Sequence, residues 1–159
     1  MASKKRRGVP AASSAAALKR MQVTRQRDTA PEVALRAILH RIGLHYRINR
    51  APILGLRRKA DVLFAGVRVA VYVDGCFWHG CPIHGTWPKQ NAEFWRLKIE
   101  ANRSRDADTD RRLEEAGWAV VRVWEHEDPE VAAESVRGVV EGRKHAAHAR
   151  GRARASTPR

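Results

Sequence analysis

The densest group of reactive side chains lies between residues 74 and 84, which read Asp-Gly-Cys-Phe-Trp-His-Gly-Cys-Pro-Ile-His. Cys76, Cys81 and His84 are ligand types that zinc binds, and a structural zinc site takes four ligands in a tetrahedron. His126, which lies much further along the chain, is the best candidate for the fourth ligand. The pattern therefore predicts a loop held by zinc. The alternative is that both cysteines are small buried hydrophobic residues.

His79 lies within the same segment, at a spacing that the zinc set does not need. It follows two adjacent aromatic residues, Phe77 and Trp78. Because an imidazole can take or give a proton near neutral pH, His79 is a candidate catalytic residue. The alternative is a surface histidine whose polar atoms are satisfied by its neighbours.

Two carboxylates earlier in the chain are further candidates. Asp61 interrupts an apolar segment, residues 60–64, that predicts a strand facing the core. Since strands disfavour aspartate, we expect a partner for it: a metal ion or, alternatively, a buried hydrogen bond. Glu32 lies in the first turn of a predicted helix, where the helix dipole favours an acid whatever its function.

The charge of the chain indicates a polyanionic partner. There are 31 Lys and Arg residues against 17 Asp and Glu, a formal net charge of +14, and nucleic acid is the first choice. A membrane surface is the rival, but the sequence predicts neither a basic helix with an aromatic face nor an apolar run that could span a bilayer. Two cysteines five residues apart fit a metal loop in a reducing compartment. We therefore expect a cytoplasmic, nucleoid-associated protein without membrane contact.

The elements that position these residues follow from the spacing of apolar side chains. The sequence predicts a helix from residues 28–29 to Gly43, a strand at 44–48 and a hairpin of strands 60–64 and 67–73. The apolar stripe of this helix consists of Leu35, Ile38, Leu39 and Ile42. In a simple register about a turn at 65–66, Asp61 faces Ala70, so a contact with Val73 would require a bulge or splayed strands.

A long helix is expected from residue 91 to residue 116, then a strand at 118–124 and a last helix from residue 128 to Gly142. Spacings of three and four place two polar residues, Asn102 and Asp106, on the inward face of the long helix, where they must be satisfied or used. The other residues of this face are Trp95, Ile99, Thr109 and Leu113. The inward residues of the last helix are predicted to be Val131, Ser135, Val136, Val139 and Val140.

The predicted order of helix, three strands, helix, strand and helix indicates a mixed α/β domain, with a small sheet flanked by helices. A chain of 159 residues is expected to form one such domain. We place it at residues 21–142, between a basic disordered arm at 1–20 and a basic disordered tail at 143–159. Both ends are basic and low in sequence complexity, which is the reason for this division.

The same residues resemble, in order, the motifs of the very-short-patch repair endonucleases. The resemblance runs from about Leu18 to His126, and the block Asp74-Gly-Cys-Phe-Trp-His79 is its most specific part. The other motifs are residues 24–32, Lys59-Ala-Asp61, Glu93-Phe-Trp95, Lys98-Ile99, Asn102 with Arg105-Asp106, Gly117-Trp118 and Val123-Trp124-Glu125. Three positions depart from the family pattern: Asp74 stands where a histidine occurs, Ala60 where a proline often occurs, and His126 where a cysteine occurs.

The resemblance implies a restriction-endonuclease-like fold and a bacterial DNA endonuclease. Members of this family nick DNA 5′ of the thymine in a T:G mismatch, which arises when 5-methylcytosine deaminates. The implied cofactors are catalytic Mg²⁺, with two ions expected, and one structural Zn²⁺. The implied partner is duplex DNA with a T:G mismatch, with mismatch-repair proteins as further candidates, and we expect a monomer. The alternatives are a restriction-type or other site-specific endonuclease on the same fold, and a non-catalytic zinc-containing DNA-binding module.

The resemblance also implies roles for single residues. Asp61 is implied to bind magnesium together with the backbone carbonyl of Val73, and His79 is implied to be the catalytic histidine. Glu32 and Asp106 match acids of the family's active site. The residues implied to meet DNA are Met21 in the minor groove and the base-stack wedge Phe77, Trp78 and Trp95. Independently of the resemblance, the basic residues Lys98 and Arg105 flank the inward face of the long helix and are candidates for phosphate contacts; the alternative is an ordinary solvated face with local ion pairs.

Overall fold

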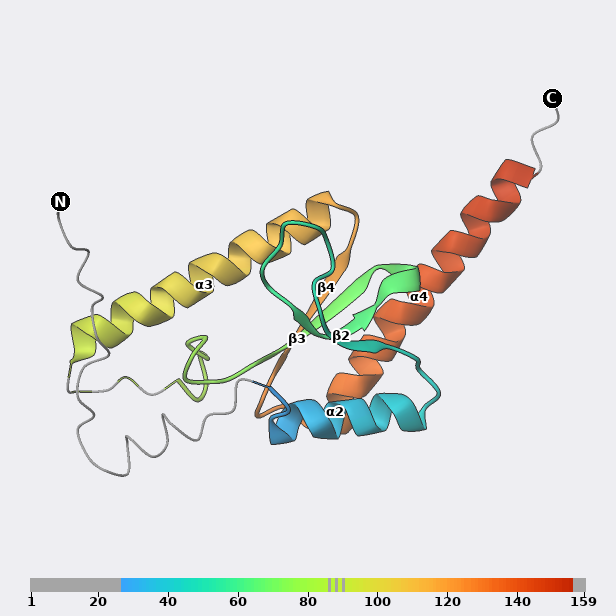
Figure 1. Ribbon diagram of the computed structural model, residues 1–159. Helices are drawn as coiled ribbons and strands as arrows, with labels where there is room; N and C mark the ends of the chain where they lie inside the picture. The colour runs from blue at the N-terminus through green and yellow to red at the C-terminus, as the bar shows by residue number, and fades with distance from the viewer. Residues whose placement is uncertain (1–26, 86, 88, 90, 156–159) are drawn as a thin grey trace.

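The computed structural model describes residues 27–85, 87, 89 and 91–155, so the predictions for residues 1–20 and for Met21 lie outside the described residues. The chain runs through a helix, three strands, a helix, a strand and a helix, as the sequence predicts (Figure 1). The elements are α2 Ala30–Arg41, β1 Arg47–Arg50, β2 Ala60–Phe64, the 3₁₀ turn η1 Ala65–Val67, β3 Val69–Asp74, α3 Ala92–Glu115, β4 Ala119–Trp124 and α4 Pro129–Ala155.

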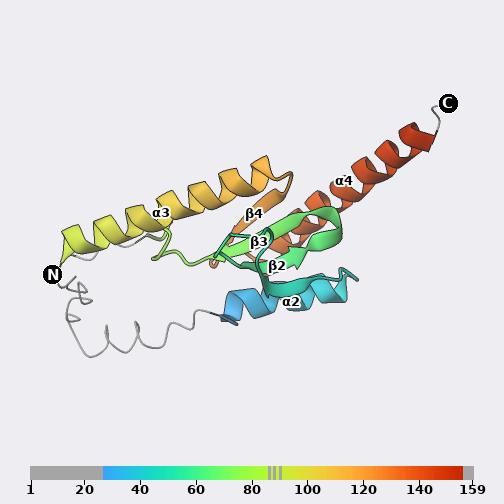
Figure 2. The ribbon, with the colours of Figure 1, turned by 45° about the horizontal axis from the view of Figure 1, so that its top comes forward.

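The four strands form one mixed sheet in the order β1-β2-β3-β4. β1, β2 and β3 are antiparallel, whereas β4 runs parallel to β3 and is reached through the long helix α3. Helices α2 and α4 lie on one face of the sheet, and α3 lies on the other (Figure 2). This arrangement confirms the predicted α/β architecture, in which helices flank a small mixed sheet as in a restriction-endonuclease-like core.

Most of the core lies between the sheet and helices α2 and α4. Leu35 of α2 and Val136 of α4 pack there against the strands, and both are almost completely buried. A smaller cluster on the other face contains Leu63 and Tyr72 from the sheet and Leu113 from α3. Replacing a buried leucine of this kind by alanine costs about 2–5 kcal/mol, so these contacts fix where the helices lie. The apolar cluster on the α3 side of the sheet is the smaller one. We therefore expect polar contacts to contribute more to the position of α3 than to the positions of α2 and α4.

The connection between β2 and β3 decides which residues face each other near the end of the sheet. The 3₁₀ turn ends with Arg68 at a positive φ of 54°, and the strands then pair Leu63 with Ala70. The predicted pair of Asp61 with Ala70 was wrong, because it assumed a two-residue turn. In the observed register Asp61 reaches Val73, whose backbone N–H donates a hydrogen bond to Asp61 Oδ2 at 2.7 Å.

Three predicted boundaries differ from the structure. The first strand is Arg47–Arg50 rather than residues 44–48. The second strand of the hairpin is Val69–Asp74 rather than residues 67–73. The last helix does not end at Gly142 but continues to Ala155, and its far end projects from the body of the molecule (Figure 1). Residues 143–155 are therefore helical, where a disordered tail was predicted. A glycine costs about 1 kcal/mol in a helix, and the Arg, Lys and Ala residues that follow it favour one.

The inward face of α4 agrees only partly with the prediction. Val136 and Val140 are buried as predicted, but Val131 and Ser135 face outward. Two alanines, at 132 and 133, lie in the core in their place, because they share the helix face of the buried valines. Among the described helices, none combines the length and the apolar character that crossing a bilayer requires.

Candidate active site and zinc-ligand cluster

The four residues predicted to bind zinc come together at one end of the sheet. The ligand atoms of Cys76, Cys81, His84 and His126 all lie within 4.8 Å of one another. Cys76 Sγ lies 3.0 Å and Cys81 Sγ 3.8 Å from Nδ1 of His126. Zinc bonds of about 2.0–2.3 Å to four tetrahedral ligands give separations of a similar size, so this group fits the metal.

The parallel pairing of β3 and β4 explains why Cys76 and His126, fifty positions apart, meet. Asp74 at the end of β3 lies opposite Trp124 at the end of β4, so the chain leaves both strands at the same edge of the sheet. The carboxylate of Glu125 accepts a hydrogen bond from the backbone N–H of Cys76 at 2.6 Å, which joins the two exits. The sheet therefore presents His126 to the cysteine loop.

The two thiols are held differently. Burial raises the pKa of Cys76 to about 11, and the neighbouring Cys81 adds to this effect. Burial also opposes the ionisation of Cys81, but hydrogen bonds from the backbone N–H groups of His84 and Ile83 outweigh it, so the pKa of Cys81 is lowered. Because the thiolate is the form that binds a metal, the backbone N–H groups that face Cys81 favour the form that a ligand needs.

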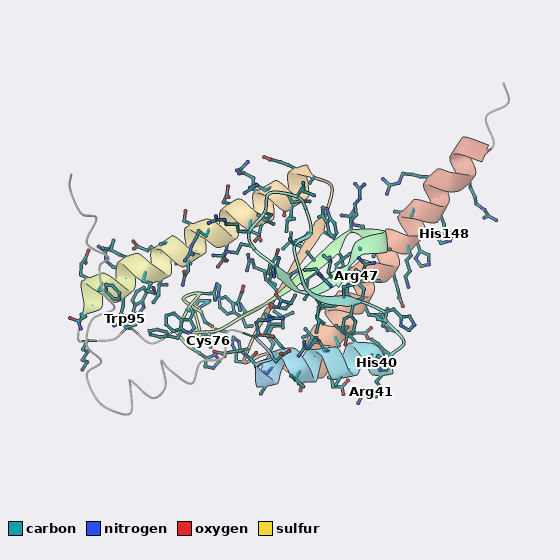
Figure 3. All side chains as sticks on the ribbon, viewed as in Figure 1. His40, Arg41, Arg47, Cys76, Trp95 and His148 are labelled. Carbon is teal, nitrogen blue, oxygen red and sulfur yellow. The ribbon has the colours of Figure 1, made fainter. Side chains whose placement is uncertain are left out.

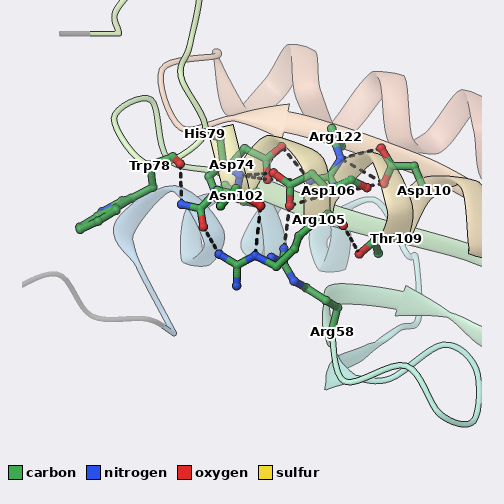
Figure 4. A network of polar contacts seen from close by, with 12 residues as sticks. Arg58, Asp74, Trp78, His79, Asn102, Arg105, Asp106, Thr109, Asp110 and Arg122 are labelled. Carbon is green, nitrogen blue, oxygen red and sulfur yellow. Dashed lines mark hydrogen bonds and ion pairs between the residues drawn. The ribbon is translucent and has the colours of Figure 1, made fainter. Parts of the chain in front are cut away.

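The loop after β3 also positions His79. Its Nδ1 atom lies 2.5 Å from Asp106 Oδ2 on α3 and 3.7 Å from Asp74 Oδ1 at the end of β3 (Figure 4). The next residue, Gly80, has a positive φ of 63°, and a Cβ atom there would lie 2.9 Å from the side chain of Ile99 on α3. The loop thus packs closely against α3 beside the histidine. The structure brings the predicted residues His79 and Asp106 together and adds Asp74.

The polar residues on the inward face of α3 are satisfied, as their placement requires. Asp106 Oδ1 accepts a hydrogen bond from Arg58 Nη1 at 2.6 Å, and the amide of Asn102 donates one to the backbone carbonyl of Trp78 at 2.8 Å. Burial would raise the pKa of Asp106, but the hydrogen bond with His79 and the nearby arginines outweigh it, so the pKa is lowered. Asp106 is therefore an ionised carboxylate that holds the imidazole ring at Nδ1.

Asp61 is linked to this pair through two consecutive residues at the end of β3. Val73, which donates a hydrogen bond to Asp61, directly precedes Asp74, which adjoins His79. Burial raises the pKa of Asp61 to about 6, the bond from Val73 lowers it in part, and the negative charges of Glu32 and Asp74 raise it further. A half-buried carboxylate among other acids is stabilised by a cation, and an oxygen ligand suits Mg²⁺. The hydrogen bond between Val73 and Asp61 uses the backbone N–H of Val73. The role of the Val73 carbonyl as a magnesium ligand stays a prediction.

Glu32 is buried at the N-terminus of α2 and makes its hydrogen bonds within that helix end. Its Oε1 accepts from the hydroxyl of Thr29 at 3.0 Å and its Oε2 from the backbone N–H of Asp28 at 2.9 Å. An acid at this position that reaches back to the residues before the helix is typical of a capping box. The contacts therefore give Glu32 a structural role, and its catalytic role stays a prediction.

Known proteins resemble most of this chain. Residues 13–84 match the family model of the DNA mismatch endonuclease Vsr. Over 141 residues, 87% of this chain and 83% of the relative, the sequence is 40% identical to the type II nicking enzyme V.NaeI of Lentzea aerocolonigenes. The chain belongs to the very-short-patch repair endonuclease family. It is accordingly a DNA endonuclease, a hydrolase.

Two further relatives extend the comparison. The type II nicking enzyme V.XorIIP of Xanthomonas oryzae pv. oryzae is 40% identical over 119 residues, 74% of this chain and 85% of the relative. The DNA mismatch endonuclease Vsr of Escherichia coli K12 is 37% identical over 109 residues, 67% of each chain. Since the match to V.NaeI covers 87% of the chain, it includes the whole segment from Asp61 to His126. The site described above thus lies inside the shared part of this endonuclease.

The aromatic residues that the family resemblance assigns to DNA form one cluster. The rings of Phe77 and Trp78 meet edge to face with centroids 5.1 Å apart, and they lie 5.4 and 6.0 Å from the ring of Trp95. Trp95, at the start of α3 (Figure 3), is 8% exposed, whereas Phe77 and Trp78 are half-buried. In this endonuclease, Trp95 therefore supports the other two rings, which carry the accessible surface of the cluster.

Four residues of the site did not enter the predicted set: Arg58, Asp74, Asp110 and Arg122. Arg122 gives a signal in the sequence, because it is a cation within a strand whose neighbours are valines. Asp110 lies one helical turn after Asp106 on α3, which places the two acids on one face. Arg58 is one of three consecutive basic residues in a loop, and nothing in the sequence distinguishes it from the other two.

Proposed function

We propose that this endonuclease nicks duplex DNA 5′ of the thymine in a T:G mismatch, by Mg²⁺-dependent hydrolysis of the phosphodiester bond. The observation that carries the proposal is that Asp61 and His79 are each linked to a residue at the end of β3. Val73 donates a hydrogen bond to Asp61, and the next residue of the strand, Asp74, lies 3.7 Å from the imidazole of His79. The relative from Escherichia coli is named a DNA mismatch endonuclease, which supports the mismatch as the target.

Asp61, with the carbonyl of Val73, is the proposed magnesium site. Its Oδ2 accepts the hydrogen bond from Val73, which leaves Oδ1 for a cation. Bound magnesium would supply positive charge that polarises the scissile phosphate and makes a bound water more acidic. The negative charge of Glu32 acts on Asp61 as well, so it favours a cation at this position.

His79 is the proposed general acid or base. Its Nδ1 is bound to Asp106, which fixes the orientation of the ring and leaves Nε2 to exchange a proton with the reacting water or the leaving oxygen. A carboxylate that orients a histidine in this way also stabilises the imidazolium that forms during proton transfer. Asp106 therefore acts through His79 in this proposal.

A structural Zn²⁺ is the second proposed metal, bound by Cys76, Cys81, His84 and His126. The support is that the four donor atoms converge and that two are thiols, which zinc prefers. The loop that this ion would hold carries Phe77, Trp78 and His79. Zinc would therefore keep the catalytic histidine and the accessible aromatic rings in a fixed relation.

The aromatic cluster is proposed to select the mismatch. Phe77 and Trp78 would enter the base stack, with Trp95 behind them. Unstacking a base step costs a few kcal/mol and costs less where the pairing is already weak, so the wedge favours a mismatch. Lys98 and Arg105, both exposed on α3, are the proposed phosphate contacts.

Several properties of this endonuclease stay predictions from its sequence and its family resemblance. They are the insertion of Met21 into the minor groove, the monomeric state, the cytoplasmic and nucleoid location, and contact with mismatch-repair proteins.

A second candidate function is nicking at a defined sequence whether or not it holds a mismatch. It is favoured by the names of V.NaeI and V.XorIIP, which are type II nicking enzymes. The same catalytic residues would serve both substrates, so the difference lies in recognition. Membership in an endonuclease family argues against the remaining alternative, a non-catalytic DNA-binding module.

A nicking assay on labelled duplexes in magnesium tests the proposal. One set of duplexes carries a single T:G mismatch in varied sequence contexts, and the control set has the same contexts fully paired. Asp61→Ala and His79→Ala should abolish nicking. Their matched controls, Asp108→Ala on the exposed side of α3 and His40→Ala on α2 (Figure 3), should nick normally. If the paired duplexes are nicked at the same rate as the mismatched ones, mismatch-specific nicking is refuted and the second candidate function takes its place.

A further inference from the structure

Arg122 lies at the centre of the polar network beside His79 (Figure 4). From β4, its Nη1 donates to both carboxylate oxygens of Asp74 on β3, at 2.9 Å each. Its Nε and Nη2 donate to the two oxygens of Asp110 on α3, at 2.9 and 2.8 Å. Nη2 also lies 3.7 Å from Asp106 Oδ1. One side chain thus connects β4 with the end of β3 and the middle of α3.

The guanidinium of Arg122 has a fixed orientation in this position. Its side chain is 23% exposed, and the guanidinium carbon lies 5.0 Å from the centre of the Tyr72 ring. Burial works against the charge, but the bonds to Asp110 and Asp74 outweigh it and raise the pKa of Arg122. A planar guanidinium that meets two carboxylates in this way holds both at a set distance and angle.

Two of the three carboxylates near the Arg122 guanidinium, those of Asp74 and Asp106, also lie beside His79. Asp74 and Asp106 lie 3.7 and 2.5 Å from Nδ1 of the imidazole. Their donor atoms and that of His79 lie within 4.8 Å of one another, a separation that a metal ion could bridge. Both oxygens of Asp74, however, accept from Arg122, and those of Asp106 are bound to Arg58 and His79. The group is therefore a clamp on the ring rather than a cation site.

We propose that Arg122 is a positioning residue for His79. The inference rests on the proposed function, in which Nε2 of His79 exchanges a proton with the reacting groups. Arg122 sets the separation between the end of β3 and α3, and with it the separation of the two carboxylates that direct the ring. Without the guanidinium, Asp74 and Asp110 lose their partner and repel Asp106, so α3 and the ring shift. A displacement of about 1 Å in a catalytic group lowers a rate by about 100-fold.

Arg122→Gln and Arg122→Lys test this role, with Arg111→Gln as the matched control. Arg111 also lies between two carboxylates, those of Asp108 and Glu115, but all three are exposed. The first measurement is the nicking rate on a T:G duplex under single-turnover conditions, together with the affinity for that duplex. The second is the set of ¹⁵N ring signals of His79 in the full chain without DNA, which reports the ring's hydrogen bond independently of activity.

Arg122→Gln should lower the nicking rate by about 100-fold while the affinity for DNA changes less than threefold. Its His79 signals should move from a single state with a proton on Nδ1 towards those of a freely exchanging imidazole. Arg122→Lys keeps the charge but not the fork that reaches two carboxylates, so it should restore only part of the rate. Arg111→Gln should change neither measurement.

Unchanged His79 signals in both Arg122 variants would overturn the positioning role, whatever the nicking rate. So would nicking by Arg122→Gln within twofold of the unsubstituted chain. If Arg122→Gln does not fold, the comparison of Arg122→Lys with the unsubstituted chain decides in the same way. Absence of nicking by the unsubstituted chain would refute the proposed function, and the ring signals would still decide the role of Arg122.

Discussion

The carboxylate of Asp61 accepts a hydrogen bond of 2.7 Å from the backbone N–H of Val73, across the antiparallel pair of β2 and β3. The bond holds one oxygen against the sheet and directs the carboxylate to the end of β3, where Asp74 and His79 lie. Burial and the charges of Glu32 and Asp74 make the ionised form of Asp61 costly until a cation binds, and the bond from Val73 offsets only part of that cost.

In buffer without magnesium, Asp61→Asn should stabilise the protein at neutral pH. The pKa of Asp61 is about 6 in the folded protein, against 3.8 as the ordinary value. The folded state therefore disfavours ionisation of Asp61, which lowers the free energy of unfolding. This loss of stability is absent below about pH 4, grows as the pH rises towards about 6, and is complete above about pH 6. A pKa difference of about two corresponds to at most about 3 kcal/mol. Urea unfolding of both proteins at about pH 4 and about pH 8 measures the effect.

The amide of an asparagine at position 61 can still accept the bond from Val73, so the comparison isolates the charge. Asp108→Asn, at an exposed acid of α3, should show no such dependence on pH. Added magnesium should narrow the difference at about pH 8, because it stabilises only the protein that retains Asp61. Equal stability of the two proteins at about pH 8 without magnesium would contradict the prediction.

Metal analysis should find about one zinc ion per chain. His126→Ala removes one of four ligands and should lower zinc affinity by more than about 100-fold, beyond the effect of losing a neighbour that only orients a ligand. The control is His148→Ala, on the projecting part of α4 (Figure 3), whose one bond among the described residues is to a backbone carbonyl of its own helix. Full zinc content in His126→Ala would remove that residue from the ligand set.

Binding to duplex DNA should weaken steeply as salt rises, because basic residues that meet phosphates release counterions. Each such contact adds about 0.9 to the slope of log affinity against log salt concentration. Arg105→Gln should reduce the slope by about this amount, whereas Arg111→Gln, whose side chain is engaged by two acids of its own helix, should not. Equal slopes for the two variants would show that Arg105 does not contact a phosphate.

Trp78→Ala should weaken binding to a T:G duplex more than binding to the paired duplex. Stacking of an aromatic side chain on a base is worth about 1–3 kcal/mol, so we expect a loss of about 5- to 150-fold on the mismatch. Trp87→Ala provides the control, since Trp87 is exposed but lies outside the cluster with Phe77 and Trp95. The wedge would be refuted by equal losses for the two variants on the mismatched duplex.

The sequence predicted those features that depend on local spacing. The helical period of α3 placed Asn102 and Asp106 on its inward face, and the structure gives both a partner there. The types and spacing of Cys76 and Cys81 indicated a metal loop, and the structure brings two histidines to it. The order of helices and strands followed from the alternation of apolar residues in the same way.

What the sequence did not predict depends on how distant segments meet. The register of β2 with β3 is set by a 3₁₀ turn with Arg68 in the left-handed region, which nothing in that arginine's type indicates. The clamp around His79 requires Asp74 and Arg122, 48 positions apart, to lie on neighbouring parallel strands. Such a crossover pairing is not visible in either segment alone. The prediction that the last helix ends at Gly142 was wrong because the residues that follow this glycine favour a helix.

The meeting of Cys76 and His126 also has a consequence for the unfolded chain. A metal that joins residues fifty positions apart acts as a cross-link around a loop that contains all of α3 and β4. Closing a loop of this length removes conformational entropy from the unfolded state worth about 4 kcal/mol, by the relation used for disulfides. The restriction extends to Asp106 and Arg122, although neither touches the metal ligands. Withdrawal of zinc would thus free, in the unfolded state, about a third of the chain, residues 76–126, which includes His79 and the residues that hold it.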